Sequence, residues 1–476
     1  MKERILTLLL IITTYTLNAQ SLISFKESKP LSILAFLKTA SGSGDMSRTL
    51  AEYIVNNVPA EDKVKFTAVI QDYRNLGLDY SYTIPGYPDS RPRPRTTLDL
   101  IIIAAVQTKD EPDFMRRIIG LLPNETWLRL RKVMNDAAPY YDKMLGKPYA
   151  KAMGSQLAAL QQYNTRLDSI FNKLNHFYGS TWSKDVPFTV AIYPVPGKRG
   201  NTTATPHSNS LVLAVLTEEK DYDMRVSVAV HEICHVLYGE QPLTLQTSMD
   251  RWFATSKDPN ALFAYNYIDE ALATACGNGW AYEQLSGKED KTGWYDNEYI
   301  NTFGHAIYPM VKEYIAANNQ LDSAFVHKAI ALFSNRFPVA YKNYQNLMNK
   351  VNIYTDAATQ QDFGNINGVI RKYYRITSSY GSYPILESMQ QLDQATGTQF
   401  FIVYRDHAAN YKLLCERFRQ LSSFKPEAEG VISFFDDQKR PVIILNAKDS
   451  SRIDRALAVM QRAGEVNSSK EFTPLE

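Results

Sequence analysis

The pattern of apolar residues changes after residue 178, and this change constrains the fold of the 476-residue chain more than any other feature. Residues 97–178 show helical periodicity. Two short runs rich in β-branched and apolar residues follow, at 188–193 and 210–216, and they predict strands. A helix is expected directly afterwards, over residues 221–239, with an aspartate as its N-cap. We therefore expect an α+β protein, a mostly helical body with a small antiparallel or mixed sheet in front of this helix.

The sequence suggests four divisions of residues 20–476. Residues 20–185 read as a helical N-terminal region, interrupted by a proline-rich loop at 84–94. Residues 186–350 hold the predicted strands and several helices, and 351–380 connect them to the end of the chain. The last part, 381–476, has the order β-α-β-β-α, which predicts a small separate α/β domain.

The first nineteen residues have the three parts of an export signal peptide. Lys2 and Arg4 provide the positive start, residues 5–12 are apolar, and residues 17–19 offer a small-residue cleavage site. The apolar block is too short to span a bilayer, and no later stretch approaches eighteen apolar residues. We expect a protein without a transmembrane segment that is secreted, or located in the periplasm or cell envelope, after cleavage near Ala19. An uncleaved anchor is the alternative.

Charge and cysteine content exclude several classes of protein. Fifty-two basic and fifty acidic residues leave a formal net charge of +2. Without a long basic run, this balance argues against nucleic acid or an anionic membrane as a partner. Three cysteines, Cys234, Cys276 and Cys415, are too few for a disulfide framework, so burial of apolar side chains must stabilise the fold. A single bridge between two of them stays open.

Two histidines lie four residues apart in the predicted helix, in the segment His231-Glu232-Ile233-Cys234-His235. This spacing puts both imidazoles on one helix face, one turn apart, where they can bind one ion. Glu232 stays outside the coordination shell and can act on a water molecule as a general base. Two imidazoles and one carboxylate leave a fourth position open, an arrangement that suits Zn²⁺. A helix with two buried histidines and an incidental glutamate is the competing interpretation.

Glu270 is the expected third metal ligand. It lies in an otherwise apolar, alanine-rich helical stretch, where a carboxylate is costly to bury unless a cation compensates its charge. Its neighbour Asp269 is an alternative ligand, or an outer partner that bonds the far nitrogen of a histidine. A solvated acid at the start of a helix is the competing interpretation.

Together these residues resemble the gluzincin peptidases, zinc enzymes with two histidines on one helix and a glutamate on a later one. The resemblance covers the two helices and, more loosely, the strands before them. It implies that His231, His235 and Glu270 are zinc ligands and that Glu232 is the general base. It also implies that strand 210–216 is the sheet edge along which a substrate peptide lies extended.

The chain departs from the known branches of this clan in two ways. Thermolysin-like members carry an aspartate four residues beyond the third ligand, where this chain has Thr274, so the ligands must be oriented differently. Neither a Gly-x-Met-Glu-Asn type of exopeptidase signature nor the third histidine of the metzincins is found. The resemblance therefore extends to a clan and not to one characterised family.

Peptide hydrolysis also needs a group that stabilises the developing oxyanion. His305 and Tyr308, three residues apart on a predicted helix after Glu270, are the candidates, because a downstream tyrosine or histidine does this in gluzincins. Core packing is the alternative role for both. His207 is expected either to line the cleft or to lie on the surface, and Cys234 to fill space against the core.

These observations favour an exported zinc-dependent hydrolase, a metallopeptidase that acts on a peptide or protein substrate. Two other functions stay open. One is a zinc-containing binding or adhesion protein of the cell envelope without peptidase activity, and the other is a zinc hydrolase of a non-peptide substrate. Glu232 argues against a purely structural site, because such a site has no use for a base. The sequence does not determine the substrate or the oligomeric state.

Overall fold

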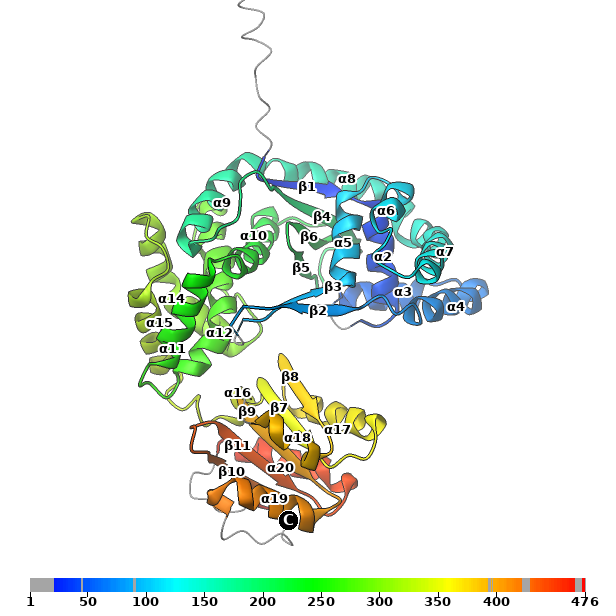
Figure 1. Ribbon diagram of the computed structural model, residues 1–476. Coiled ribbons are helices and arrows are strands. Elements are labelled where there is room, and N and C mark those ends of the chain that lie inside the picture. The colour runs from blue at the N-terminus through cyan, green and yellow to red at the C-terminus, as the bar shows by residue number, and fades with distance from the viewer. Residues whose placement is uncertain are drawn as a thin grey trace, which may run out of the picture. The chain divides into compact units, whose positions relative to one another are not determined.

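The computed structural model describes most of the chain (Figure 1). The described residues are 21–43, 46–88, 91–392, 395, 397–421, 429–466 and 473–475. The predicted export signal, residues 1–19, lies outside them. With 58% helix and 15% strand in small mixed sheets, the protein is α+β, as its sequence predicts. Among the described residues, no helix has the length and apolar character needed to cross a membrane.

The chain divides into two compact units. The first unit consists of Met1–Thr255 and Tyr267–Leu332, and the second of Ser256–Asn266 and Phe333–Glu476. The boundaries therefore differ from the expected ones. The helical N-terminal region shares one unit with the strands and helices that follow it, and an eleven-residue stretch before Tyr267 belongs to the C-terminal unit.

The first unit surrounds a four-stranded sheet with helices. Its strands are β1 (Ile23–Glu27), β4 (Phe188–Val195), β5 (Ala204–His207) and β6 (Ser210–Leu216), with the hairpin of β2 (Ser81–Ile84) and β3 (Arg93–Thr96) outside the sheet. Its first helices are α2 (Lys29–Ala40), α3 (Arg48–Asn57), η1 (Ala60–Asp62), α4 (Lys63–Arg74), α5 (Thr97–Gln107), α6 (Glu111–Arg117), α7 (Asn124–Tyr141), η2 (Asp142–Gly146), α8 (Lys147–Gln161) and α9 (Asn164–Tyr178). After the sheet come α10 (Tyr222–Gly239), α11 (Leu243–Ala254), α12 (Ala261–Ala273), η3 (Thr274–Ala281), α13 (Tyr282–Ser286), α14 (Glu298–Ala316) and α15 (Ser323–Arg336). Of these, α12 belongs to the first unit from Tyr267 onward and α15 up to Leu332.

The strand order of this sheet is β1-β4-β6-β5. Strands β1, β4 and β6 run parallel, and β5 pairs antiparallel with β6. All seven residues of β6 are buried, as expected for a parallel strand covered on both faces. The prediction that residues 210–216 form the sheet edge is therefore wrong, because β5 covers that side of β6 and is itself the edge strand.

Helices cover both faces of the sheet. Alternate residues of β4, such as Ala191 and Tyr193, join the apolar core built by α2 to α7. The other face of the sheet is covered by α8 to α10, of which α10 contacts β5 and β6 (Figure 1). The sheet thus supports α10, the helix that carries both histidines.

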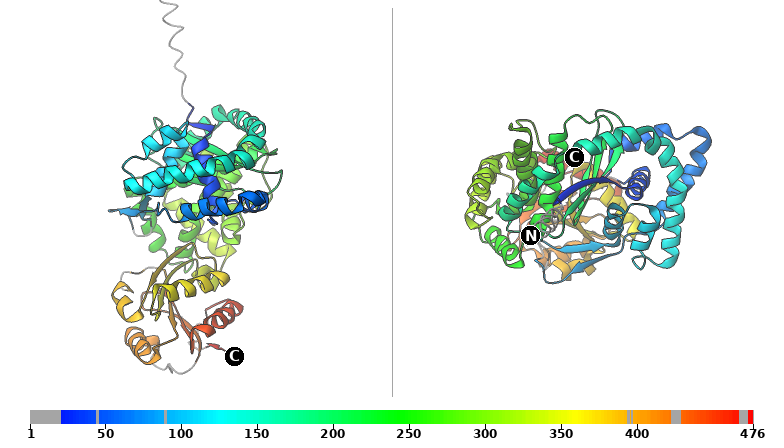
Figure 2. Two further views of the ribbon diagram at one scale, coloured as in Figure 1. Left: turned by 90° about the vertical axis from the view of Figure 1, so that its right-hand side faces the viewer. Right: turned by 90° about the horizontal axis from the view of Figure 1, so that it is seen from above.

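Two N-terminal segments differ from their predicted structure. Residues 25–27, expected to be helical, belong to β1, which lies beside β4 (Figure 2). In β1, buried Ile23 and Phe25 alternate with less buried neighbours, a strand pattern too short to stand out in the sequence. The proline-rich stretch is a hairpin as well as a loop, in which Pro94 pairs with Thr83.

The second unit is an α/β structure around a six-stranded sheet of order β12-β10-β11-β9-β7-β8. Its strands are β7 (Lys350–Thr355), β8 (Ser378–Ser382), β9 (Thr398–Val403), β10 (Gly430–Phe435), β11 (Pro441–Asn446) and β12 (Thr473–Pro474). Its helices are α16 (Tyr344–Leu347), α17 (Gln360–Tyr373), α18 (Ile385–Leu392), α19 (His407–Arg417), η4 (Arg419–Leu421), η5 (Ser450–Arg452) and α20 (Ile453–Ala463). Helices flank both faces of this sheet (Figure 2). One apolar core lies under α17 and α20, and another under α18 and α19.

The segment 351–380, expected to be a connection, is an integral part of this sheet. It contributes most of β7, which pairs in parallel with both β8 and β9. The earlier stretch Ser256–Asn266 belongs to the same unit through Asn260. The Asn260 side chain bonds Ser334, the carbonyl of Pro338 and the backbone N–H of Tyr341. Such long-range bonds leave no periodic trace in the sequence.

Candidate metal centre

Helix α10 places the two histidines side by side. Asp221 caps its N-terminus by accepting a hydrogen bond from the backbone N–H of Met224, as expected of an aspartate at the start of this helix. His231 and His235 then lie one turn apart on one face, with 3.1 Å between their Nε2 atoms. Their ring planes are nearly perpendicular, at 78°.

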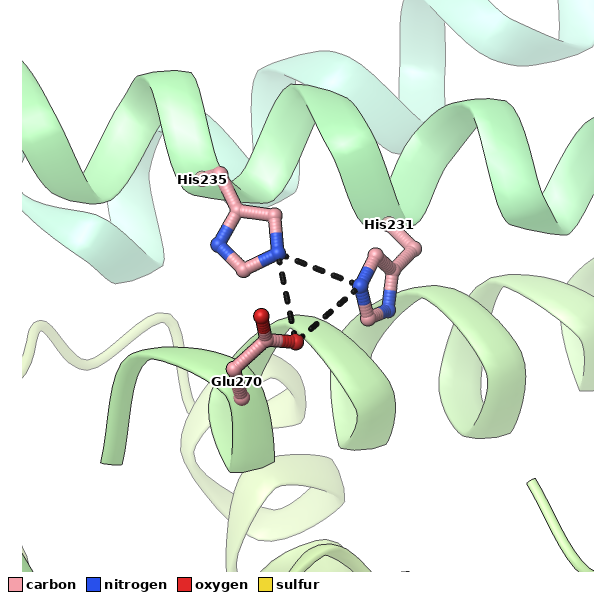
Figure 3. Close-up of side chains that lie close together, drawn as sticks. All are labelled: His231, His235 and Glu270. Carbon is pink, nitrogen blue, oxygen red and sulfur yellow. Dashed lines mark hydrogen bonds and ion pairs between the residues drawn. The ribbon is translucent and has the colours of Figure 1, made fainter. Parts of the chain in front are cut away.

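Glu270, on α12, completes the group of three side chains that the sequence predicts. Its Oε2 lies 3.6 Å from Nε2 of His231 and 3.5 Å from Nε2 of His235 (Figure 3). These three atoms form a cluster that could hold a metal ion. The structure thus brings together three residues that span forty positions of the sequence.

The size of this cluster fits Zn²⁺. With metal–ligand bonds of about 2.0–2.1 Å and tetrahedral angles, two ligand atoms of one zinc ion lie about 3.3 Å apart. The three observed separations, 3.1, 3.5 and 3.6 Å, bracket this value. Oε2 of Glu270 is buried and has no hydrogen-bond partner among the described residues. A carboxylate oxygen in this situation is costly to bury unless a cation lies beside it.

The far nitrogen of each imidazole is bonded to an oxygen atom. Nδ1 of His235 lies 3.0 Å from Oδ1 of Asp269, and Nδ1 of His231 lies 2.9 Å from Oδ1 of Asn278. Carboxylate and amide oxygens can only accept, so both Nδ1 atoms donate. In the neutral imidazoles this leaves a lone pair on each Nε2, directed into the cluster. Asp269 therefore has the outer role that the sequence left open for it.

The charged side chains of the cluster shift one another's pKa values. Burial raises the pKa of Glu270, but the imidazoles of His231 and His235 outweigh this effect and hold it well below its usual range. Burial lowers the pKa of His235, but the carboxylates of Asp269 and Glu270 outweigh burial and raise it well above its usual value. These carboxylates therefore favour a positive charge at His235.

Glu232 shares this electrostatic environment without a hydrogen bond to the three predicted ligands. Its carboxylate is partly buried, and burial raises its pKa, while the neighbouring imidazoles oppose the increase. A carboxylate whose pKa is raised toward neutrality is better suited to accept a proton and pass it on.

His305 and Tyr308, the predicted oxyanion residues, have other contacts. The His305 ring stacks on Trp294 at 3.7 Å, and its Nε2 bonds the carbonyl of Thr292. The Tyr308 hydroxyl donates a hydrogen bond to Glu283, which also pairs with Lys312. Burial and this carboxylate raise the pKa of Tyr308. The structure gives neither side chain a contact with the predicted metal ligands.

Tyr295 lies beside the centre instead. Its ring stacks against that of His231, with 6.2 Å between centroids and 25° between planes. It belongs to the loop before α14, where no periodicity marks a residue as facing the site. Neither Tyr295 nor Asn278 could be recognised from the sequence, because their positions depend on contacts between distant segments.

Two further residues from the sequence analysis have structural contacts. His207 is buried at the end of β5, and its Nδ1 lies 2.8 Å from Oδ1 of Asp99 on α5. Cys234 is fully buried, as expected of a residue that fills space against the core. Burial raises the pKa of its thiol. All three cysteines are free, which agrees with the prediction that no disulfide framework supports the fold.

Comparison of the chain with protein-family models finds no match, and neither a search of curated proteins nor one of solved structures finds a similar protein.

Proposed function

We propose that this protein is a zinc-dependent hydrolase, and specifically a metallopeptidase of gluzincin type. The observation that carries the proposal is the convergence of two Nε2 atoms and one carboxylate oxygen at separations that fit one face of a zinc tetrahedron. His231, His235 and Glu270 hold the ion in this proposal. Both Nδ1 donors are already bonded, which supports a ligand role for both Nε2 atoms.

Glu232 provides the general base. Zn²⁺, when bound, polarises a carbonyl group and makes water more acidic. The chain's own contribution is a carboxylate one residue after the first ligand, with a pKa raised by burial. Glu232 accepts a proton from the attacking water and donates it to the leaving amine, so it ends the reaction in the state in which it began.

Tyr295 supplies the hydroxyl that stabilises the oxyanion in this proposal. Its ring stacks on that of His231, one of the proposed ligands. A tyrosine hydroxyl that reaches the reacting carbonyl can donate a hydrogen bond to the oxygen that becomes negative in the transition state.

The position of β5 at the edge of the sheet supports the proposal that the substrate is a peptide. Ala214 donates its N–H to the carbonyl of Thr203, so in this antiparallel pair Ala204 directs its own N–H and carbonyl away from β6. No strand pairs with that side of β5 in the described part of the chain. Since β5 also contacts α10, an extended peptide added to this edge would run past the helix that carries the histidines.

The test combines metal analysis with digestion of a peptide library by the wild type and by Glu232→Gln. We expect one zinc per chain in both proteins, and cleavage by the wild type that falls by about 10²–10⁴-fold in the variant. Glu232→Gln is the matched control because it keeps the shape of the side chain and all three ligands.

Three results would contradict parts of this proposal. A wild type that binds no zinc would overturn the metal centre. Stoichiometric zinc with no cleavage of peptides by either protein would overturn the peptidase assignment and favour a binding protein or a hydrolase of another substrate. Equal cleavage by both proteins would exclude Glu232 as the base.

A further inference from the structure

The hydrogen-bond partner of Nδ1 of His231 does not come from the position that helical periodicity predicts. The residue four places beyond Glu270 is Thr274, which would face α10 if α12 continued as a regular helix. Thr274 instead packs toward α14, where its Cγ2 lies 3.1 Å from the place that a Cβ on Gly304 would take. Its buried Oγ1 has no hydrogen-bond partner among the described residues. The partner of His231 is Asn278, eight places beyond Glu270.

A change of helix type brings Asn278 to this place. Helix α12 ends at Ala273 and continues directly as η3, a π-helix whose eight residues are all buried. In an α-helix with 3.6 residues per turn, a residue eight places on is rotated about 80° away from the starting face. A π-helix closes i→i+5 bonds, so its turn takes more residues and reduces this offset. Glu270 and Asn278 can therefore both face α10.

A glycine lets η3 and α10 come into contact at the first histidine. A Cβ added to Gly277 would lie 2.6 Å from the Cα, Cβ and backbone nitrogen of His231, closer than such atoms approach. Position 277 therefore needs a residue without a side chain. This close approach carries the neighbouring Asn278, which is 8% exposed, to within 2.9 Å of the imidazole.

We infer that Asn278 is the positioning residue of the first metal ligand, and that the π-helix η3 and Gly277 serve to place it there. This inference rests on the proposed zinc site. The Asn278 amide oxygen accepts the Nδ1 proton of His231, which sets the tautomer and holds the ring so that Nε2 faces Glu270. Asn278 does not touch the metal or the substrate in this role.

The two histidines are held by different chemistry. His235 is bonded to a carboxylate whose side chain is 42% exposed, and His231 to a neutral amide that is buried. A second carboxylate at the buried position would add a negative charge in a region of low dielectric. The amide oxygen provides the same kind of hydrogen-bond acceptor without that cost. Asn278 therefore orients His231 without adding a charge, whereas Asp269 orients His235 and adds a negative charge.

The test measures zinc affinity of the full chain by competition with a chromophoric chelator. Asn278→Leu removes the acceptor at similar volume, and we expect its affinity for Zn²⁺ to fall by about 10- to 100-fold. Asn278→Asp restores an acceptor and should recover most of the loss. The visible absorption of Co²⁺-loaded protein should change in Asn278→Leu and return toward that of the wild type in Asn278→Asp, a recovery that a purely structural role would not produce.

Thr274→Val is the matched control, because it changes another buried polar side chain of η3, whose Cγ2 packs toward Gly304 of α14. We expect its zinc affinity to equal that of the wild type. Thermal unfolding of the metal-free proteins checks the fold, and Asn278→Ala provides the same comparison if Asn278→Leu does not fold.

The outcomes separate this inference from the proposed function. A wild type that binds no zinc would overturn the zinc site itself. A wild type that binds zinc, together with a folded Asn278→Leu or Asn278→Ala of equal affinity, would overturn only the positioning role. A loss of affinity in Thr274→Val as large as in Asn278→Leu would also overturn it, because the effect would then belong to η3 packing in general.

Discussion

Each imidazole of the centre has one nitrogen bonded to an oxygen acceptor and one directed at Glu270. At the scale of single residues, this division of roles directs both Nε2 atoms at one carboxylate, which supports the proposed ligand role for them. The buried Oε2 of Glu270 lies opposite both Nε2 atoms and lacks a hydrogen-bond partner among the residues described. Three acceptors that converge on one point repel one another unless a cation lies between them.

The residue-scale prediction compares two tyrosines. We expect Tyr295→Phe to lower kcat by about 10²–10³-fold, because it removes the hydroxyl proposed to stabilise the oxyanion, while zinc content stays at that of the wild type. Tyr308→Phe, whose hydroxyl is held by Glu283, should change kcat little. Steady-state kinetics on one peptide substrate decides between them. A large loss in Tyr308→Phe alone would restore Tyr308 to the catalytic role that the sequence suggested.

At the scale of elements, the centre depends on α10, on α12 with its continuation η3, and on the close packing between them. Helix α10 holds two of the proposed ligands and is supported by the sheet, whereas α12 and η3 hold the third proposed ligand and the hydrogen-bond partners of both Nδ1 atoms. Gly277 makes this packing possible because it lies against the backbone of His231, and Gly304 of α14 in the same way lies against Thr274 of η3.

Two glycine substitutions test this packing. Gly277→Ala should destabilise the protein by about 1–3 kcal/mol, because its Cβ would lie 2.6 Å from atoms of His231 and force α10 and η3 apart. Gly154→Ala, in α8, has no neighbour within 4 Å of the new Cβ and should stabilise by about 0.5–1 kcal/mol. Urea unfolding of both variants measures the difference. If the two variants were equally stable, the contact between α10 and η3 would accommodate the new Cβ at no cost in free energy of unfolding.

At the scale of the whole molecule, the proposed metal centre lies within one of the two compact units. The predicted ligands and their outer partners all belong to the first unit. So do all five tryptophans, Trp127, Trp182, Trp252, Trp280 and Trp294. Tryptophan fluorescence therefore reports on the unit that contains the metal centre and not on the six-stranded sheet.

The whole-molecule prediction follows from this distribution. Zn²⁺ at a concentration of 100 times its Kd should stabilise the first unit by about 2.7 kcal/mol, because the ion binds the folded state. The midpoint temperature of unfolding, measured by tryptophan fluorescence, should rise when zinc is added and return to its original value after chelation. Glu270→Gln, which lacks the third ligand, should show a much smaller shift at the same concentration. A transition independent of zinc in the wild type would contradict the metal centre.

The sequence by itself was sufficient for features that depend on neighbouring residues. The four-residue spacing of His231 and His235 places them on one face in any α-helix, and the apolar setting of Glu270 marked it as a carboxylate that needs compensation. Strands β4 and β6, the N-cap of α10 and the α+β class followed from local periodicity in the same way.

Only the tertiary structure decided what depends on contacts between distant segments. It placed β5 at the sheet edge and took β7 into the C-terminal sheet. It also brought Tyr295 to His231 and Asn278 to its Nδ1, although neither residue stands at a position that helical periodicity would select. The physical reason is that strand order, close backbone approach and a local change to π-helix are set by packing against other elements, and packing leaves no periodic record in the chain.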